Sequence, residues 1–586
     1  MDRWVHPAIF YFIGALLLPF FKGKAKKGFI LLIPLLSIID VALMHEGIFG
    51  TYEFLNVSVT FGRVDKLSLV FAWVFTIMAF LGALYALHVK EDGHHIAGFF
   101  YVGSSLGALF SGDYLSLFIF WEIMAFSSVF LVWYRKKKRS IDAGFRYLLM
   151  HIFGGLCFLA GMMFYYYKTG GLAFERILPE GAGLAEYLIL AGFSLNAAVL
   201  PLHAWLPDAY PEATVEGAVF MCAFTTKTAV YVLARGFPGF EILAILGTAM
   251  TVYGVFYAVI ENDMRRVLAY HIISQVGYMV AGVGIGTEMA VNGACAHAFA
   301  HILYKALLFM GAGAVLYMTG TAKLSKLGGL YKYMPLTMIC YVVGAVSISG
   351  FPLFSGFVSK SMVVASAHES GRIGLLLFMN LAGIGTFLSV GLKVTYFAFF
   401  SKEPAIEVKE PPKNMLWSMG LTSALCFIIG IYPQSLYALL PYPVHYHPYT
   451  LSHLAETLQI LSFTGLVFFL LVGKLAPEDK INLDVDYFYR KGTWLFMKFD
   501  EKVISVVDAI WGELYRTLGL SFLFKNAEIS NTIDRKVIDG IVDGSATTVR
   551  GIGSIVKRLQ TGRIQAYIGF SLFIFFIILW IFLGRT

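Results

Sequence analysis

The chain of 586 residues is 58% hydrophobic and only 14% charged, and its mean hydropathy is +0.72. A soluble domain has about a quarter charged residues, so this composition excludes an ordinary soluble protein of several domains. Apolar runs of helix length recur from end to end and lack the alternation of a membrane barrel, which predicts an all-α polytopic membrane protein. The net charge of +8 is carried by loops between these runs, so we expect no nucleic-acid partner.

The five cysteines all lie in apolar segments and form no CxxC pair. This pattern excludes a disulfide scaffold and disfavours a cysteine metal site. The sequence also has no cysteine cluster for an iron–sulfur centre and no Rossmann or Walker fingerprint. We therefore expect no cofactor, no metal and no catalytic residue in this chain. Residues 1–21 carry few charges and lack a small-residue cleavage site, which predicts a retained helix.

Sixteen segments are apolar and long enough to span a membrane. They lie near residues 4–21, 28–46, 66–88, 95–111, 114–134, 145–168, 186–202, 213–235, 239–260, 268–287, 290–317, 336–367, 374–400, 416–434, 455–474 and 563–584. We group them as N-terminal helices (1–94), a first half (95–235), a second half (239–400), C-terminal helices (401–474), an amphipathic region (475–562) and a final anchor (563–586). The two halves are expected to be inverted five-helix repeats.

The basic clusters test this count, because loops rich in lysine and arginine face the cytoplasm. The clusters are 22–27, 135–139, Arg265 with Arg266, and Lys323, Lys326 and Lys332. With the N-terminus outside, every cluster faces the cytoplasm, and the intervening loops are poor in basic residues. The sequence therefore predicts a multi-pass protein of the plasma membrane in contact with lipid.

The amphipathic region contains no spanning segment, yet residues 497–560 alternate apolar and charged positions at helical spacing. About sixty helical residues would reach roughly 90 Å. We expect this lateral helix to lie on the cytoplasmic membrane surface or on neighbouring membrane subunits. The alternative is a small cytoplasmic helical domain.

Ionisable residues inside the apolar segments are the candidate ion-translocation residues, because each costs several kcal/mol there unless it is paired or hydrated. A single one is as often a packing device as a functional group. The whole set suits a proton relay over five helices. Three of its members are spaced i, i+4 and i+8 on one helix face. The candidates are Glu122, Lys227, His297, His301, Lys305, Lys360 and Lys393.

Two apolar runs are interrupted by proline, at 203–213 (HAWLPDAYPEA) and 347–357 (SISGFPLFSGF). Interruptions at corresponding places in two halves of a transporter indicate ion sites at the repeat interface, and ordinary proline kinks are the alternative. Near the first interruption, Asp208 and Glu216 are additional candidates. Glu216 could serve another ion path or cap its helix.

Five of these segments resemble the signature segments of a known family: PLHAWLPDAYPEA, TTKTAVYVLAR, DMRRVLAYHIISQVGYM, HAFAHILYKALLFMGAG and SGFPLFSGFVSK. The family comprises the antiporter-like subunits of respiratory complex I, Mrp-type cation/proton antiporters and membrane-bound hydrogenase-type complexes. The resemblance covers about residues 60–400. The ending VKRLQTGRIQAYIGF resembles the tail of the distal complex I subunit, where a lateral helix runs along neighbouring subunits before a last spanning helix.

The resemblance implies a role for most candidates. Glu122 matches the glutamate that pairs with a lysine in the first half-channel, and Lys227 matches a lysine of the eighth helix. His297, His301 and Lys305 match the central relay, and Lys360 matches the ionisable group that faces the outlet. One departure is Asn196, which stands where the family has the lysine partner of the glutamate. Either this glutamate–lysine switch is incomplete, or Lys227 replaces the missing partner.

Three functions remain open from the sequence. The first is an ion-pumping subunit, for protons or sodium, of a redox-driven respiratory complex whose iron–sulfur or other redox centres lie in peripheral partner subunits. The second is a cation/proton exchange subunit of an Mrp-type assembly without redox subunits. The third is a structural clamp with an impaired channel, which Asn196 favours. The lateral helix favours the first and third, because it needs neighbours to lie on.

Overall fold

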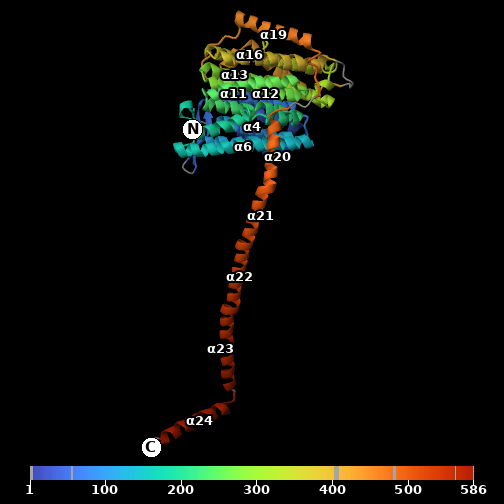
Figure 1. The fold of residues 1–586 in the computed structure, drawn as a ribbon. Coiled ribbons are helices and arrows are strands. Elements are labelled where there is room, and N and C mark those ends of the chain that lie inside the picture. Colours follow the sequence, from blue (N-terminus) through green and yellow to red (C-terminus); the bar gives the residue numbers. More distant parts are fainter. Residues whose placement is uncertain (1–3, 55–56, 402–407, 480–482, 561, 585–586) are drawn as a thin grey trace. The chain divides into compact units, whose positions relative to one another are not determined.

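The computed structural model describes residues 4–54, 57–401, 408–479, 483–560 and 562–584. The regular structure of these residues is helical apart from one β-hairpin, and the chain separates after Asp486 into two units. Within the described part, eleven helices are long and apolar enough to cross a membrane, and three shorter apolar helices accompany them. The expected all-α polytopic membrane fold is confirmed, and the long helices of the first unit lie side by side (Figure 1).

The N-terminal part and first half contain α1 (Pro7–Leu17), α2 (Gly23–Leu43), β1 (Gly47–Phe54), β2 (Val57–Val64), α3 (Lys66–Tyr85), α4 (Asp92–Phe110), α5 (Tyr114–Trp133), α6 (Lys138–Thr169), α7 (Leu184–Asn196), α8 (Trp205–Ala209), α9 (Val215–Ala223) and α10 (Thr225–Gly236). The second half and C-terminal part of this unit contain α11 (Glu241–Ile260), α12 (Met264–Ile285), α13 (Glu288–Thr319), α14 (Pro335–Ser349), α15 (Ser355–Glu369), α16 (Ile373–Thr386), α17 (Lys413–Ile431), α18 (Gln434–Tyr437) and α19 (Leu451–Leu471).

Each of the sixteen expected spans overlaps a helix, although only eleven of the described helices are long and apolar enough to cross a membrane. Two of the spans differ from the expectation in where the helix ends or breaks. The seventh ends at Asn196, earlier than expected. The eighth is divided at Phe224 into α9 and α10. The twelfth is divided into α14 and α15 around Pro352, as the glycines and proline predicted. Each interruption releases backbone carbonyl and amide groups inside the bundle.

The β-hairpin is a feature that the sequence did not predict, because it lies between the expected spans 28–46 and 66–88, where no element was assigned. Its strands pair antiparallel, with Thr51 opposite Thr60. The Thr60 amide donates to the Asp113 carboxylate at 2.7 Å. Asp113 also caps the start of α5, so the hairpin is attached to the first half.

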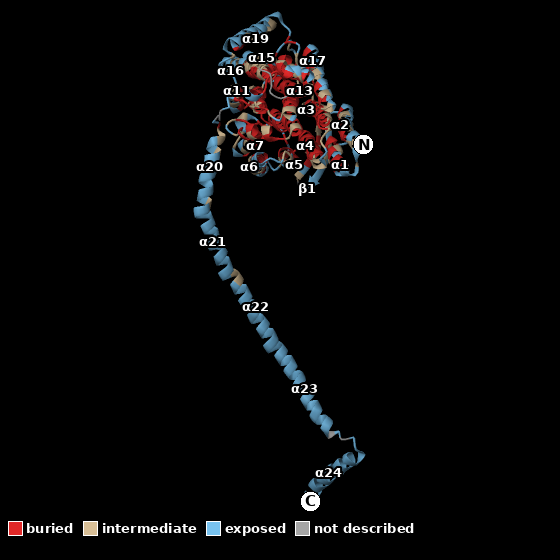
Figure 2. Cartoon of the chain, turned by 90° about the vertical axis from the view of Figure 1, so that its right-hand side faces the viewer, coloured by how far each residue is buried: buried red, intermediate tan, exposed pale blue. Residues whose placement is uncertain are grey.

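Helices α12 and α13 form the centre of the first unit and are buried along almost their whole length (Figure 2). A helix that is apolar on all sides is stable only when neighbours cover it. By contrast α6 exposes an apolar face that includes Phe145, Leu149 and Phe153. Polar side chains on α12 and α13 are therefore removed from solvent almost completely.

The two halves show the same construction. Helices α6 and α13 each have 32 residues and begin 150 positions apart, at 138 and 288. Both end in a left-handed glycine, Gly170 and Gly320. The preceding threonines, Thr169 and Thr319, make equivalent hydrogen bonds two residues onward. This agreement supports the two repeats and gives their register.

Asp113 and Asp263 extend the correspondence between the halves to the helices before α6 and α13. Each of them caps the next helix through its carboxylate. Each also bridges the strand-like segment that follows its half's 32-residue helix, at Ala173 and at Lys323. The 150-residue offset therefore holds at both ends of these elements.

The second unit consists of α20 (Asp486–Phe499), α21 (Ser505–Leu514), α22 (Ser521–Ile533), α23 (Asp539–Leu559) and α24 (Ile564–Leu583). Short π-helical turns join α20 to α23 into one helical path, visible in Figure 1. About 70 residues at 1.5 Å each give a length of about 110 Å. The sequence predicted that this helix starts near residue 497, but it begins earlier, at Asp486. Its described side chains are exposed, apart from a few that are partly buried. Between α20 and α23, large apolar side chains such as Ile510, Trp511 and Leu518 are exposed.

Candidate functional site

The centre of the first unit holds a file of three ionisable side chains on α13, His297, His301 and Lys305, called the central file here. All three are fully buried, and their i, i+4, i+8 spacing places them on one face. His297 is held by Ser359 at 3.2 Å through Nδ1 and by Gln275 at 3.2 Å through Nε2. The central file therefore contacts both α12 and the second half of the broken helix, α15.

The rest of the central file is unpartnered. Both ring nitrogens of His301 lack a hydrogen-bond partner among the described residues. The Nζ atom of Lys305 lacks one as well. A buried polar group without a partner costs about 1–3 kcal/mol, and more when it is charged. Such groups persist where function requires them rather than where stability does.

Lys227 lies at the break between α9 and α10. Its Nζ donates to the Cys222 carbonyl at 2.7 Å and to Thr226 Oγ1 at 3.0 Å. The Cys222 carbonyl is free to accept because the helix is interrupted at Phe224. The break thus holds the buried ammonium group of Lys227 through a backbone oxygen and a hydroxyl, and no carboxylate among the described residues bonds to it.

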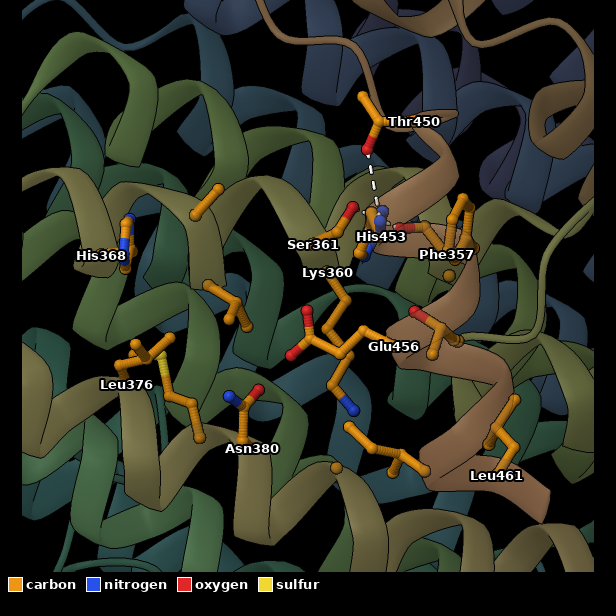
Figure 3. A pocket seen from close by; sticks show the side chains of 18 of the residues that line it. Phe357, Lys360, Ser361, His368, Leu376, Asn380, Thr450, His453, Glu456 and Leu461 are labelled. Carbon is orange, nitrogen blue, oxygen red and sulfur yellow. Dashed lines mark hydrogen bonds between the residues drawn. The ribbon is translucent and has the colours of Figure 1, made fainter. Parts of the chain in front are cut away.

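Lys360 lies in the second turn of α15 and, like His297 of the central file, packs on the Tyr278 ring. Its Nζ is 4.7 Å from the centre of the Tyr278 ring. Its side chain lines a cavity of about 560 Å³ between α15, α16 and α19. The labelled side chains of Lys360, His453 and Glu456 extend into this cavity (Figure 3). The Lys360 side chain therefore lies between the buried Tyr278 ring and this pocket's lining residues.

Lys393 is held at the end of α11. Its Nζ donates to the backbone carbonyls of Val259 and Glu261 at 2.5 and 3.3 Å, and a cation is favourable at a helix C-terminus. It lies in a π-helical segment, Phe387–Val394, whose Ser389 bonds to His271 of α12 at 2.6 Å. His271 was not among the candidates, although it lies in the quoted segment DMRRVLAYHIISQVGYM.

In the first half, Glu122 is not paired with lysine. Its Oε1 is buried and has no hydrogen-bond partner among the described residues. The carboxylate lies against α6 at Gly155, where an added Cβ would overlap Oε1. The contacts of Lys227 are with Cys222 and Thr226, so the geometry does not support Lys227 as the replacement partner.

Asn196 contacts a residue that the sequence reasoning missed. Its Oδ1 is 2.8 Å from Nδ1 of His151 on α6. His151 is a single histidine in an apolar run, a pattern that alone carries little information. The signal that could have found it is the 150-residue offset between α6 and α13, which places His151 at the position of His301.

Each of the two additional candidates lies beside a basic side chain. Asp208 accepts two hydrogen bonds from Arg146, at 2.7 and 3.0 Å. Glu216 is 2.9 Å from His88 Nε2. The residue that caps α9 is Thr214, whose hydroxyl accepts from the Gly217 amide. Glu216 lies in the first turn of α9, where a carboxylate is favourable at the helix N-terminus, so its placement agrees with a stabilising role there.

A further carboxylate reaches the first half from beyond α19. Asp484 is buried and accepts hydrogen bonds from Tyr253 and from Tyr270, the latter at 2.6 Å. It also lies 3.5 Å from Nε2 of His203, in the break between α7 and α8. Burial alone would raise the pKa of Asp484, but the bonds from His203 and the two tyrosines outweigh it and lower the pKa to about 2. No group of three His, Cys, Asp or Glu side chains in the described residues could hold a metal ion.

Comparisons with known proteins agree with this architecture. A family model described as the transmembrane region of NADH:quinone oxidoreductase/Mrp antiporter matches residues 111–388. One Na(+)/H(+) antiporter protein of Alkalihalophilus pseudofirmus is 31% identical over 360 residues, which are 58% of this chain and 72% of that protein. Across the curated relatives reported, the chain spans between 40% and 72% of the relative's length.

Two solved structures share the fold. The Mrp complex from Dietzia sp. DQ12-45-1b matches with a TM-score of 0.72 at 22% identity, over 89% of this chain and 62% of that one. The membrane-bound sulfane sulfur reductase, an archaeal respiratory membrane complex, matches with a TM-score of 0.66 at 23% identity, over 78% of this chain and 97% of that one.

The fold and its buried ionisable residues define an antiporter-like, multi-pass membrane subunit. The chain belongs to the NADH:quinone oxidoreductase/Mrp antiporter family.

Proposed function

We propose that this chain moves protons across the membrane through its second half. The observation that carries the proposal is the central file, where a lysine and a histidine are fully buried without hydrogen-bond partners among the described residues. A neutral imidazole accepts a proton and an ammonium donates one. Adjacent groups of these two kinds can therefore pass a proton along α13.

The proposed route has three steps. Lys227, held at the α9–α10 break, exchanges a proton with Lys305 and His301. His297 receives it next, since it is the following member of the central file one turn along. Lys360 then releases it into the cavity that Glu456 also lines. Sodium remains a second ion, because Na(+)/H(+) exchange is named for the relative of Alkalihalophilus pseudofirmus.

The experiment is proton uptake by proteoliposomes of the native complex carrying Lys305→Ala. Loss of uptake with normal assembly is the expected result. Lys66→Met is a matched control, because Lys66 is an exposed lysine at the start of α3. Unchanged uptake in Lys305→Ala would remove Lys305 from the route.

The assembly around the chain belongs to the same proposal. The uncovered apolar face of α20–α23 fits neighbouring membrane subunits better than solvent. We infer that the chain works in the plasma membrane with its lateral helix and basic loops on the cytoplasmic side. Redox centres in peripheral partners would supply the drive, a proposal supported by the fold that this chain shares with an archaeal respiratory membrane complex.

The second candidate is cation/proton exchange in an Mrp-type assembly, which the similarity to the Alkalihalophilus pseudofirmus antiporter protein favours. Purification of the native complex separates the two. Iron–sulfur or other redox subunits that co-purify in fixed ratio support the redox-driven pump. Their absence, with ion exchange retained, supports the exchanger.

A further inference from the structure

We propose that His151 is the proton carrier of the first half, a role that rests on the proposed proton translocation. It lies on α6 at the position that His301 occupies on α13. The equivalence is seen in the sequence, since His151 and His301 are each followed by isoleucine and, ten positions on, by glycine. The matching helix ends at Gly170 and Gly320 fix this register independently.

The surroundings of His151 leave one ring nitrogen free. The residue is 1% exposed, and its ring packs on Tyr147 at 4.2 Å and on Trp205 at 4.6 Å between centroids. Its Nδ1 is 2.8 Å from the Asn196 carbonyl oxygen, which can only accept. Nδ1 therefore carries the hydrogen, and Nε2 is a lone-pair acceptor. Nε2 has no hydrogen-bond partner among the described residues.

Glu122 is the proposed proton donor for Nε2. Glu122 of α5 lies against Gly155, which is four residues after His151 and hence on the same face of α6. When Glu122 holds a proton, transfer breaks its O–H bond and forms an N–H bond at Nε2. The products are a carboxylate and an imidazolium, whose attraction offsets part of the cost of forming two charges in a buried place.

The onward path leads to Lys227. Tyr147, stacked on His151, bonds through its hydroxyl to Ser128 at 2.8 Å and lies near Thr225. Thr225 bonds to Tyr101 at 2.6 Å, and the next residue, Thr226, accepts from Lys227. Hydroxyl groups both donate and accept, so they can pass a proton along such a series. Each half thus contributes one histidine at the same repeat position.

If His151 has only a structural role, its replacement by glutamine should leave proton uptake intact. If His151 carries the proton, the same replacement should abolish uptake. His151→Gln keeps a polar amide beside Asn196 and removes the titratable ring. His95→Gln is the matched control, because His95 is also buried and bonds to a backbone carbonyl, that of Val89. We expect native complex with His151→Gln to assemble and to lose proton uptake to the level of Lys305→Met, while His95→Gln retains it.

Gly155→Ala tests the proton transfer from Glu122 to His151 without changing the histidine. It also tests the proposal if the His151→Gln complex does not assemble. The new methyl group must displace the Glu122 carboxylate from its place beside the His151 turn. Gly154→Ala is its control, since its methyl group meets only the Leu195 side chain, at 3.3 Å. We expect uptake to fall in Gly155→Ala and to persist in Gly154→Ala.

The outcomes separate this inference from the proposed function. If Lys305→Met loses uptake while His151→Gln and Gly155→Ala stay above that level, His151 is not the carrier and the proposed function stands. If Lys305→Met keeps full uptake, the proposed function fails and the inference fails with it.

Discussion

Replacement of Lys305 by methionine should stabilise the protein while it abolishes translocation. Lys305 is fully buried in the middle of α13, and its Nζ has no hydrogen-bond partner among the described residues. An unsatisfied buried donor costs about 1–3 kcal/mol. Methionine has a similar length and no donor, so the variant should gain a free energy of unfolding of about this size. In a chain this large, the gain corresponds to a rise in Tm of roughly a few degrees.

Thermal unfolding of the purified complex measures the stability, and proton uptake by proteoliposomes measures the function. Leu307→Met is the matched control, because Leu307 is also fully buried on α13. A swap of leucine for methionine costs less than about 1.5 kcal/mol and should leave uptake intact. The reasoning would be refuted if Lys305→Met lowered Tm by the equivalent of about 3–5 kcal/mol, because that is the loss expected from breaking a buried ion pair.

Three other predictions follow from ion pairs and from the second unit. Arg235→Met should destabilise the first unit by about 2–4 kcal/mol in thermal unfolding, because it breaks the two bonds, 2.7 and 2.8 Å long, that join buried Arg235 to Asp65; an unchanged Tm would contradict this. Asp484→Asn should cost about 2 kcal/mol at pH 7, since a pKa of about 2 lies below the ordinary 3.8. The Asp484 contribution is present above about pH 4 and is lost as the pH falls through 2, so the difference in Tm between variant and native protein should shrink over that range; a constant difference would refute it. Removal of residues 487–586 should reduce co-purification of neighbouring subunits while the first unit stays folded, and full assembly of the truncated chain would count against the clamp.

The sequence predicted the parts of the site whose signal is local. The spacing of His297, His301 and Lys305 is a property of one helix, and α13 indeed places them on one face. The glycines and Pro352 predicted the break between α14 and α15. The break at Phe224 was missed because no glycine or proline marks it, only the polar run Thr225–Lys227 that follows.

Residues whose partners lie far along the chain could not be predicted in this way. Asp484 meets Tyr270 across 214 positions, and no local pattern contains that contact. Nothing in the sequence around Asp208 indicates its ion pair with Arg146, which lies 62 positions earlier. His151 became visible only after the register of the two repeats was fixed by the ends of α6 and α13.

The most direct test of the account compares proton and sodium uptake by proteoliposomes of the native complex with that of Glu122→Gln and Lys305→Ala. Glu122 belongs to the first-half step proposed with His151, and Lys305 belongs to the route through the second half, so the pair samples both halves. We predict that both variants assemble and that both lose coupled proton movement. Full retention of ion movement in both would mean that the ions cross elsewhere in the complex and that this chain is a structural brace.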